Sequence, residues 1–177
     1  MEFGYEVKIP KERVAVLVGV KGNVKNKVAK ALGIKITVDS REGDVLLKGD
    51  DSLSLLTAQN IVKAIGRVFN PDVAMNLLDE SNYLEVVDIE QYVGGSKSNL
   101  IRVRARVIGT GGKARRTIEE LTSTKVVIYG KTISIIGNFE GVALARKAFE
   151  SLLSGSRHTT VYAWLEKHRK EIKHKMY

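Results

Sequence analysis

Two glycine motifs, ninety positions apart, are the residues best suited to chemistry in this chain of 177 amino acids. Both have the form Gly-x-x-Gly, at positions 19–22 and 109–112, and basic residues follow each of them closely. Glycine adopts left-handed backbone angles without steric cost, and its missing Cβ lets backbone N–H groups come close to a phosphate. The two motifs therefore predict a pair of loops that bind anionic groups through the backbone.

The distribution of charge indicates a polyanionic partner for both loops. The formal net charge is +9. Lysine and arginine outnumber aspartate and glutamate by nine to four over residues 11–48, by eight to two over 102–131 and by six to two over 157–177. Residues 70–100 have the opposite balance, one to six. A lysine-rich surface that serves only solubility would not follow the two loops in this way.

Residues that the chain lacks argue against several classes of function. There is no cysteine, which excludes disulfides, thiolate metal sites and thiol catalysis. All three histidines fall after position 157 without a carboxylate cluster beside them, so we expect no metal site, no cofactor and no catalytic residue. No apolar run approaches the roughly 20 residues that span a bilayer, and residues 1–6 do not resemble a signal peptide. We therefore expect a cytoplasmic protein with no membrane partner.

The second motif also fits a dinucleotide-binding pattern, Gly109-x-Gly111-x-x-Ala114. That pattern calls for a carboxylate at the end of the next strand, but residues 126–130 supply none, and the parallel crossover order is missing. A phosphate-binding Walker loop is absent as well, because Val107 stands where glycine is required. These departures disfavour a nucleotide-dependent enzyme.

The two halves of the chain predict the same order of elements. Period-two stretches indicate strands, helical spacing of apolar residues indicates helices, and Pro10, Gly33 and Ser96 stand at helix ends. Residues 101–108 alternate with period two, but the repeat places a helix there, and we follow the repeat. The hairpin of the second copy is shorter by two residues. The expected strands are 5–9, 34–38, 45–47, 84–89, 126–128 and 132–136, and the expected helices are 11–18, 25–32, 50–69, 96–108, 113–122, 139–153 and one from about 160 onward.

This order of strand, helix, Gly-x-x-Gly, helix, hairpin and helix resembles the KH domain, a fold that binds single-stranded nucleic acid. In the second copy, Val107–Lys113 and Thr117–Thr122 are similar to the family's Ile-Gly loop and its Ile-Glu-Glu-x-Thr helix. The resemblance implies an α+β fold of two tandem type I KH-like domains, each with a three-stranded antiparallel sheet and three helices. The implied divisions are a first domain at 1–70, an acidic helical connector at 71–82, a second domain at 83–155 and a basic amphipathic C-terminal helix at 156–177.

Details of the second half resemble a narrower group, the partner-of-Nob factors of ribosome assembly. The details are the segments Ile135–Gly141 and Leu153–Ser156, the pair Ala145-Arg146 and a tail that contains Tyr162. The resemblance implies binding of small-subunit rRNA near its 3′ end, in pre-rRNA processing, with partners that include a Nob-type endonuclease. Because a long charged N-terminal extension is lacking, the chain looks like the compact archaeal form. Two alternatives stay open: a protein-docking scaffold in which one KH copy does not bind RNA, and a KH factor of RNA decay or translation.

The KH resemblance also implies which residues touch RNA. The Gly-x-x-Gly backbone of such a domain clamps about four nucleotides, whose bases point into an apolar groove. Val14, Val18, Val28, Ile36 and Val38 supply either that groove or the core. Gly111 departs from the basic residue that is common at the loop centre, and Arg102 and Arg106 lie one helical turn apart. The predicted RNA-binding residues are Gly19, Val20, Lys21, Gly22 and Lys25 at the first loop, and Arg102, Arg106, Gly109, Thr110, Gly111, Gly112, Lys113, Arg115 and Arg116 at the second.

Overall fold

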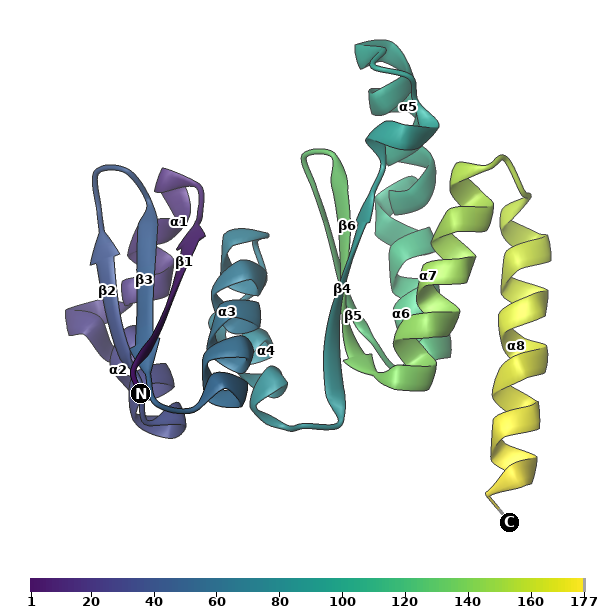
Figure 1. Ribbon diagram of the computed structural model, residues 1–177. Coiled ribbons are helices and arrows are strands. Elements are labelled where there is room, and N and C mark those ends of the chain that lie inside the picture. Colours follow the sequence, from purple (N-terminus) through teal and green to yellow (C-terminus); the bar gives the residue numbers. More distant parts are fainter. Residues whose placement is uncertain (177) are drawn as a thin grey trace. The chain divides into compact units, whose positions relative to one another are not determined.

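The computed structural model describes residues 1–176 and divides the chain into two compact units, Met1–Glu80 and Ser81–Tyr177. Each unit contains one three-stranded antiparallel sheet with helices packed against it (Figure 1). The strand orders are β1-β3-β2 and β4-β6-β5, so the last strand of each unit lies in the centre of its sheet. The predicted α+β class is confirmed.

The first unit follows the predicted order closely. Its sheet strands are β1 (Phe3–Lys8), β2 (Lys35–Asp39) and β3 (Asp44–Gly49), and its helices are α1 (Lys11–Val18), α2 (Asn23–Leu32) and α3 (Ser52–Gly66). Asp51 caps α3, because its carboxylate accepts hydrogen bonds from the amides of Leu53 and Ser54. This cap fixes the start of α3, which packs on α1 and α2 on either side of the first loop.

The second unit repeats these elements and adds one helix. It contains β4 (Asn82–Asp88), α5 (Lys97–Ile108), α6 (Lys113–Thr122), β5 (Lys125–Tyr129), β6 (Thr132–Asn138), α7 (Phe139–Leu153) and α8 (His158–Lys175), with the short turn η3 (Glu90–Tyr92) before α5. Only Gly130 and Lys131 separate β5 from β6, which confirms that the second hairpin is shorter by two residues. Residues 101–108 are helical within α5, and Ser96 caps that helix as predicted.

Two segments outside the repeats pack within the units that contain them. The helix α4 (Pro71–Ala74) and the turn η2 (Met75–Leu78) lie in the range expected as a connector, yet they contact α3 and belong to the first unit. The C-terminal helix α8, yellow in Figure 1, packs on α6 and α7 and buries Val161 and Leu165. Its apolar stripe is thus part of the second unit's core.

Candidate nucleic-acid interface

The two Gly-x-x-Gly segments have nearly the same backbone conformation. The first glycine has φ and ψ of 74° and 178° at Gly19 and of 75° and 170° at Gly109. The last glycine has 77° and 14° at Gly22 and 78° and 14° at Gly112. We call residues 19–22 the first loop and 109–112 the second loop. Because no described side chain caps α2 or α6, the first amides of both helices lack the usual side-chain acceptor, which favours an anion there.

The first glycine of each loop is required by both conformation and space. A Cβ added at Gly109 would lie 2.6 Å from the amide nitrogen of Ala114, and one at Gly19 would lie 2.9 Å from that of Val24. Both positions also have positive φ, which is costly for other residues. The missing Cβ therefore lets the loop lie close to the start of the following helix.

The loop centres differ in their side chains. Lys21 adopts φ 52° and ψ 29°, an uncommon conformation for a residue with a Cβ, and its side chain is exposed. Gly111 takes the same place with φ 60° and ψ 23°, and no atom lies within 4 Å of where its Cβ would be. The first loop thus holds an ammonium group at its centre, whereas the second loop has no cationic side chain, only the hydroxyl of Thr110.

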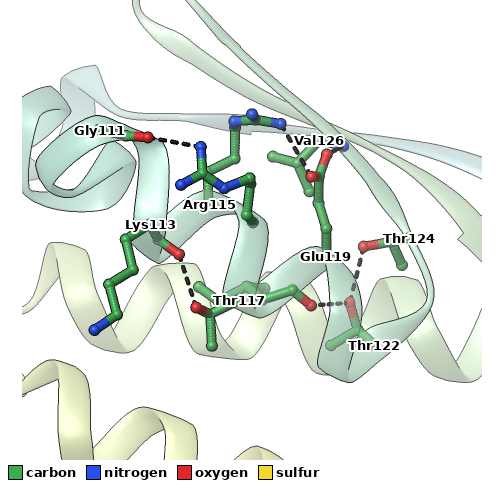
Figure 2. Close-up of polar contacts among 10 residues, drawn as sticks. Gly111, Lys113, Arg115, Thr117, Glu119, Thr122, Thr124 and Val126 are labelled. Atoms are coloured by element: carbon green, nitrogen blue, oxygen red, sulfur yellow. Dashed lines mark hydrogen bonds and ion pairs between the residues drawn. The ribbon is translucent and has the colours of Figure 1, made fainter.

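Two of the arginines that follow the second loop are engaged inside the unit (Figure 2). Arg116 donates from Nη1 to the carbonyl oxygen of Gly111 at 2.6 Å. Arg115 forms an ion pair with Glu119, 3.0 Å between Nη1 and Oε2, and Glu119 in turn accepts from the amide of Val126 at 2.8 Å. This network fastens α6 to the loop and to β5. Arg116 keeps further N–H donors for a phosphate, while the charge of Arg115 is partly neutralised.

Arg106 is hydrogen-bonded within the second unit, whereas Arg102, one helical turn away, is exposed. The guanidinium of Arg106 donates from Nε to the carbonyl of Leu152 at 3.0 Å and from Nη2 to the carbonyl of Ser156. Leu152 lies at the C-terminal end of α7, where a cation is favoured, and Ser156 lies in the link between α7 and α8. Arg102 is exposed, as are Lys113 and Thr110, and Lys25 is partly exposed. Of the two predicted arginines, Arg102 is therefore the one with a free surface position.

Arg13 forms the equivalent bonds in the first unit, and the sequence did not predict this role. Arg13 donates from Nε to Ile65 at 2.8 Å and from Nη2 to Phe69 at 3.0 Å, at the end of α3. It lies six residues before its loop, whereas Arg106 lies three before, so aligning the repeats does not pair them. Between the two acceptors, Val68 has φ 77°, which is strained for a β-branched residue. In both units an arginine ties the helix before the loop to the last repeat helix.

The apolar residues beside the first loop divide between core and surface. Val14, Val28 and Ile36 are buried, whereas Val18 and Val38 are partly exposed. In the second unit Ile118 and Val126 are buried and Ile128 is partly buried. The partly exposed members are those available to a base in a groove between the helices and β2 or β5.

Two aromatic side chains lie beside the second loop and were missed by sequence reasoning. His158 and Tyr162, from the first turns of α8, line a cavity together with Gly109, Thr110 and Lys113. Burial raises the pKa of the Tyr162 phenol, and a hydrogen bond with Thr117 opposes this shift. Nearly fifty positions separate these rings from the loop in sequence, and only the docking of α8 on α6 brings them together.

The described residues show little else that could perform chemistry. Among residues 1–176, no three or more His, Asp or Glu side chains lie close enough together to hold a metal ion. In the same part of the chain, no helix is both long and apolar enough to cross a membrane. The loops and their surroundings are therefore the strongest candidate site in the described structure.

Comparisons with known proteins agree with this geometry. A family model described as a eukaryotic type KH domain, KH-domain type I, matches residues 83–170 and carries the name of the second KH domain of PNO1. A KH domain-containing protein of Methanocaldococcus jannaschii is 46% identical over 94% of this chain and 74% of its own length. The chain belongs to the PNO1 family of KH-domain proteins.

Eukaryotic members of the PNO1 family are longer than this chain. The RNA-binding protein PNO1 of Oryzias latipes is 36% identical over 63% of this chain, a match that covers 46% of its own length. A pre-rRNA-processing protein of Aspergillus fumigatus is 32% identical over 84% of this chain and 55% of its own length. This chain thus aligns with about half the length of these two relatives.

Solved structures show the PNO1-family fold over nearly the whole chain. A protein of unknown function from Aeropyrum pernix has a TM-score of 0.93 and 39% identity over 99% of this chain and 95% of its own. Dim2p of Pyrococcus horikoshii, in a complex with a/eIF2α and rRNA, has a TM-score of 0.88 and 41% identity over 96% of both chains. That neighbour was thus crystallised with RNA.

Proposed function

We propose that this chain is a non-catalytic RNA-binding factor of small-subunit ribosome assembly, and that both loops contact the phosphates of single-stranded rRNA near its 3′ end. The observation that carries the proposal is the matching backbone of two loops with exposed, uncapped helix starts. Support comes from relatives named for RNA binding and pre-rRNA processing, and from a structural neighbour that was crystallised with rRNA.

The proposal treats the first unit as a second RNA-binding module of the same type. The family model covers the second unit, while the first unit has the same order of elements, the same strand order and the same loop angles. We therefore propose two tandem type I KH domains at 1–70 and 83–155, joined by 71–82 and followed by the basic helix from residue 156. The arginines that brace both loop helices in the same manner support this division.

Ribosome-assembly proteins, including a Nob-type endonuclease, are the protein partners we propose. Such a partner would cut the RNA that this chain holds, because no catalytic grouping is evident beside the loops. Asp72 and Glu80 are exposed in the first unit and would suit a basic protein, whereas Glu85 and Glu90 in the second unit are paired with Arg146 and Lys131. RNA binding and protein binding would then use different faces of the chain.

Charge reversal at the loops tests the proposal. The variants Lys21→Asp and Thr110→Asp/Gly111→Asp each change the charge by two and place carboxylates where phosphates would lie. Lys30→Asp and Lys147→Asp change the charge by the same amount on exposed helical positions away from the loops. We expect each loop variant to weaken binding of an oligonucleotide from the 3′ end of small-subunit rRNA by about tenfold or more, and each control by much less. If folded loop variants bind as tightly as their controls, the proposal is wrong.

A further inference from the structure

A cavity of about 400 Å³ opens beside the second loop, on the side of α8. Its walls come from α5, from Gly109 and Thr110, from the first turn of α6 and from the first turns of α8. No residue of β5 lines it, so it is separate from the partly buried Ile128 of that strand. Its size falls at the lower end of the range of about 300–1,000 Å³ that is usual for ligand sites.

Two aromatic rings form one wall of this cavity. His158 and Tyr162 are one helical turn apart on α8, with ring centroids 6.2 Å apart and planes tilted by 56°. His158 is fixed because its Nε2 donates to the carbonyl oxygen of Arg106 at 2.9 Å, which leaves Nδ1 as an acceptor in the neutral ring. Immobile rings with a hydrogen-bonding edge are suited to holding a nucleobase.

The polar groups of the cavity match the rest of a nucleotide. Lys113 supplies an ammonium group, and Thr110 and Thr159 supply hydroxyl groups, while none of the nine lining residues is acidic. Two other cavities of the second unit carry both signs of charge, because Glu140 lies with Arg169 and Lys173 in one and Glu90 lies with Lys97 and Lys131 in the other. The cavity beside the loop combines a cation, hydroxyl groups and two aromatic rings without a carboxylate, a lining that suits a nucleotide.

The position of the cavity also compensates for a feature of the second loop. Gly111 gives that loop no cation at its centre, so a positively charged contact must come from neighbouring elements. Arg106 lines the cavity, and its guanidinium binds the carbonyls of Leu152 and Ser156, which lie just before α8 in the chain. These bonds fix the start of α8 and therefore the cavity wall that it forms. A preorganised wall costs little ordering entropy when a ligand enters.

We propose that this cavity binds one nucleotide of the RNA strand adjoining those clamped by the second loop, with its base against His158 and Tyr162 and its phosphate near Lys113. The inference rests on the proposed RNA-binding function and adds a site formed by α8, outside the repeated fold. RNA bound by the second unit would then extend around the loop onto α8.

Filling the cavity tests this inference with the full chain. Thr159→Phe places a ring in the cavity from an exposed position, and Thr160→Phe is the matched control, since Thr160 is also exposed but lines a different cavity. Affinity is measured for rRNA 3′-end oligonucleotides that are lengthened one nucleotide at a time from a four-nucleotide core, at either end. We expect wild type and Thr160→Phe to gain about tenfold on adding one particular nucleotide, and Thr159→Phe to lack that gain.

The outcomes separate this inference from the proposed function. If Thr159→Phe gains affinity at the same length as wild type, the cavity does not bind RNA, although the loop clamp stands. If a charge reversal at the second loop leaves binding of the core oligonucleotide unchanged, the clamp itself fails and the cavity site fails with it. Loss of a protein partner on Thr159→Phe, with RNA binding unchanged at every length, would likewise overturn the inference.

Discussion

The first and second loops show how one backbone can be used in two ways. Their glycines differ by at most a few degrees in φ, yet Lys21 occupies the centre of one loop and Gly111 that of the other. The first loop has its cation on the loop itself and no helix like α8 beside it in residues 1–80. The second loop has Arg116 folded onto it and α8 at its side. The repeat thus preserves the backbone of the loops, while the side chains around them come from different places.

Removing a first glycine should have the largest effect, and it tests whether the shared backbone matters. Gly109→Ala puts a methyl group against the Ala114 amide and strains φ, so the loop must shift. We expect the RNA affinity of the chain to fall by roughly tenfold or more, measured by fluorescence anisotropy. Gly111→Ala is the control, because open space surrounds its Cβ position. Equal losses for both variants would show that the close contact is unimportant.

The next largest effects are expected for Arg106, which should matter for stability of the second unit, and for Arg102, which should matter for RNA binding. Arg106→Ala leaves the carbonyls of Leu152 and Ser156 without their charged donor, and we expect it to destabilise the second unit by about 2 kcal/mol. Trp164 is the single tryptophan and lies in α8, so its fluorescence reports unfolding of that unit in urea. Arg102→Ala should weaken RNA binding with little change in stability. A reversal of these two results would place Arg106, rather than Arg102, on the RNA.

Exchanging the loop centres should have a smaller effect, of a few-fold in affinity. Lys21→Gly removes one cation from the first loop, and Gly111→Lys adds one to the second at φ 60°, close to the 52° that Lys21 already tolerates. Each phosphate contact changes the slope of log affinity against log salt by about 0.7 for a single strand. We expect Lys21→Gly to flatten the slope by this amount and Gly111→Lys to steepen it. Unchanged slopes would mean that neither centre faces a phosphate.

The smallest effect concerns the caps of α3 and α7. Hydrogen bonds from Ser54 lower the pKa of Asp51 at the start of α3, whereas the uncharged Asn138 caps α7 by accepting from the amide of Gly141 at 2.7 Å. A carboxylate whose pKa is lower in the folded state stabilises it above its unfolded pKa of about 4, and this contribution is lost as the pH falls through the folded value. The protection of α3 amides against hydrogen exchange, relative to the intrinsic rate at each pH, should therefore fall on acidification more than that of α7 amides. Asp51→Asn should remove the difference, and an unaltered difference would contradict this assignment.

Much of the fold could be predicted from sequence because it depends on local patterns that occur twice. The strand-like alternation of residues 101–108 is overridden in α5, where the repeat and the Ser96 cap correctly indicated a helix. The hydrogen-bond and ion-pair partners of individual side chains could not be predicted in the same way. The acceptors of Arg106 lie 46 and 50 residues later in the chain, and the ion pair of Arg115 with Glu119 competes with the phosphate role expected for that arginine.

The site showed the same limit in its aromatic residues. The sequence predicted an apolar groove and no aromatic residue at the loops, because His158 and Tyr162 come from the segment 156–177 that was assigned to a basic C-terminal helix. Their place beside Gly109 depends on α8 packing along α6, which is tertiary information. Gly111 was the one sequence signal that the second loop needs contacts from elsewhere.

Cross-linking tests the central claim, that both loops bind RNA, most directly. The wild-type chain is bound to an rRNA 3′-end oligonucleotide that carries photoreactive nucleotides, and the cross-linked peptides are mapped by mass spectrometry. We predict two separate groups of cross-links, one over residues 19–25 and one over 109–116. Cross-links that avoid both loops, and gather instead on the hairpin turn at 40–43 or on the last turns of α8, would contradict the account.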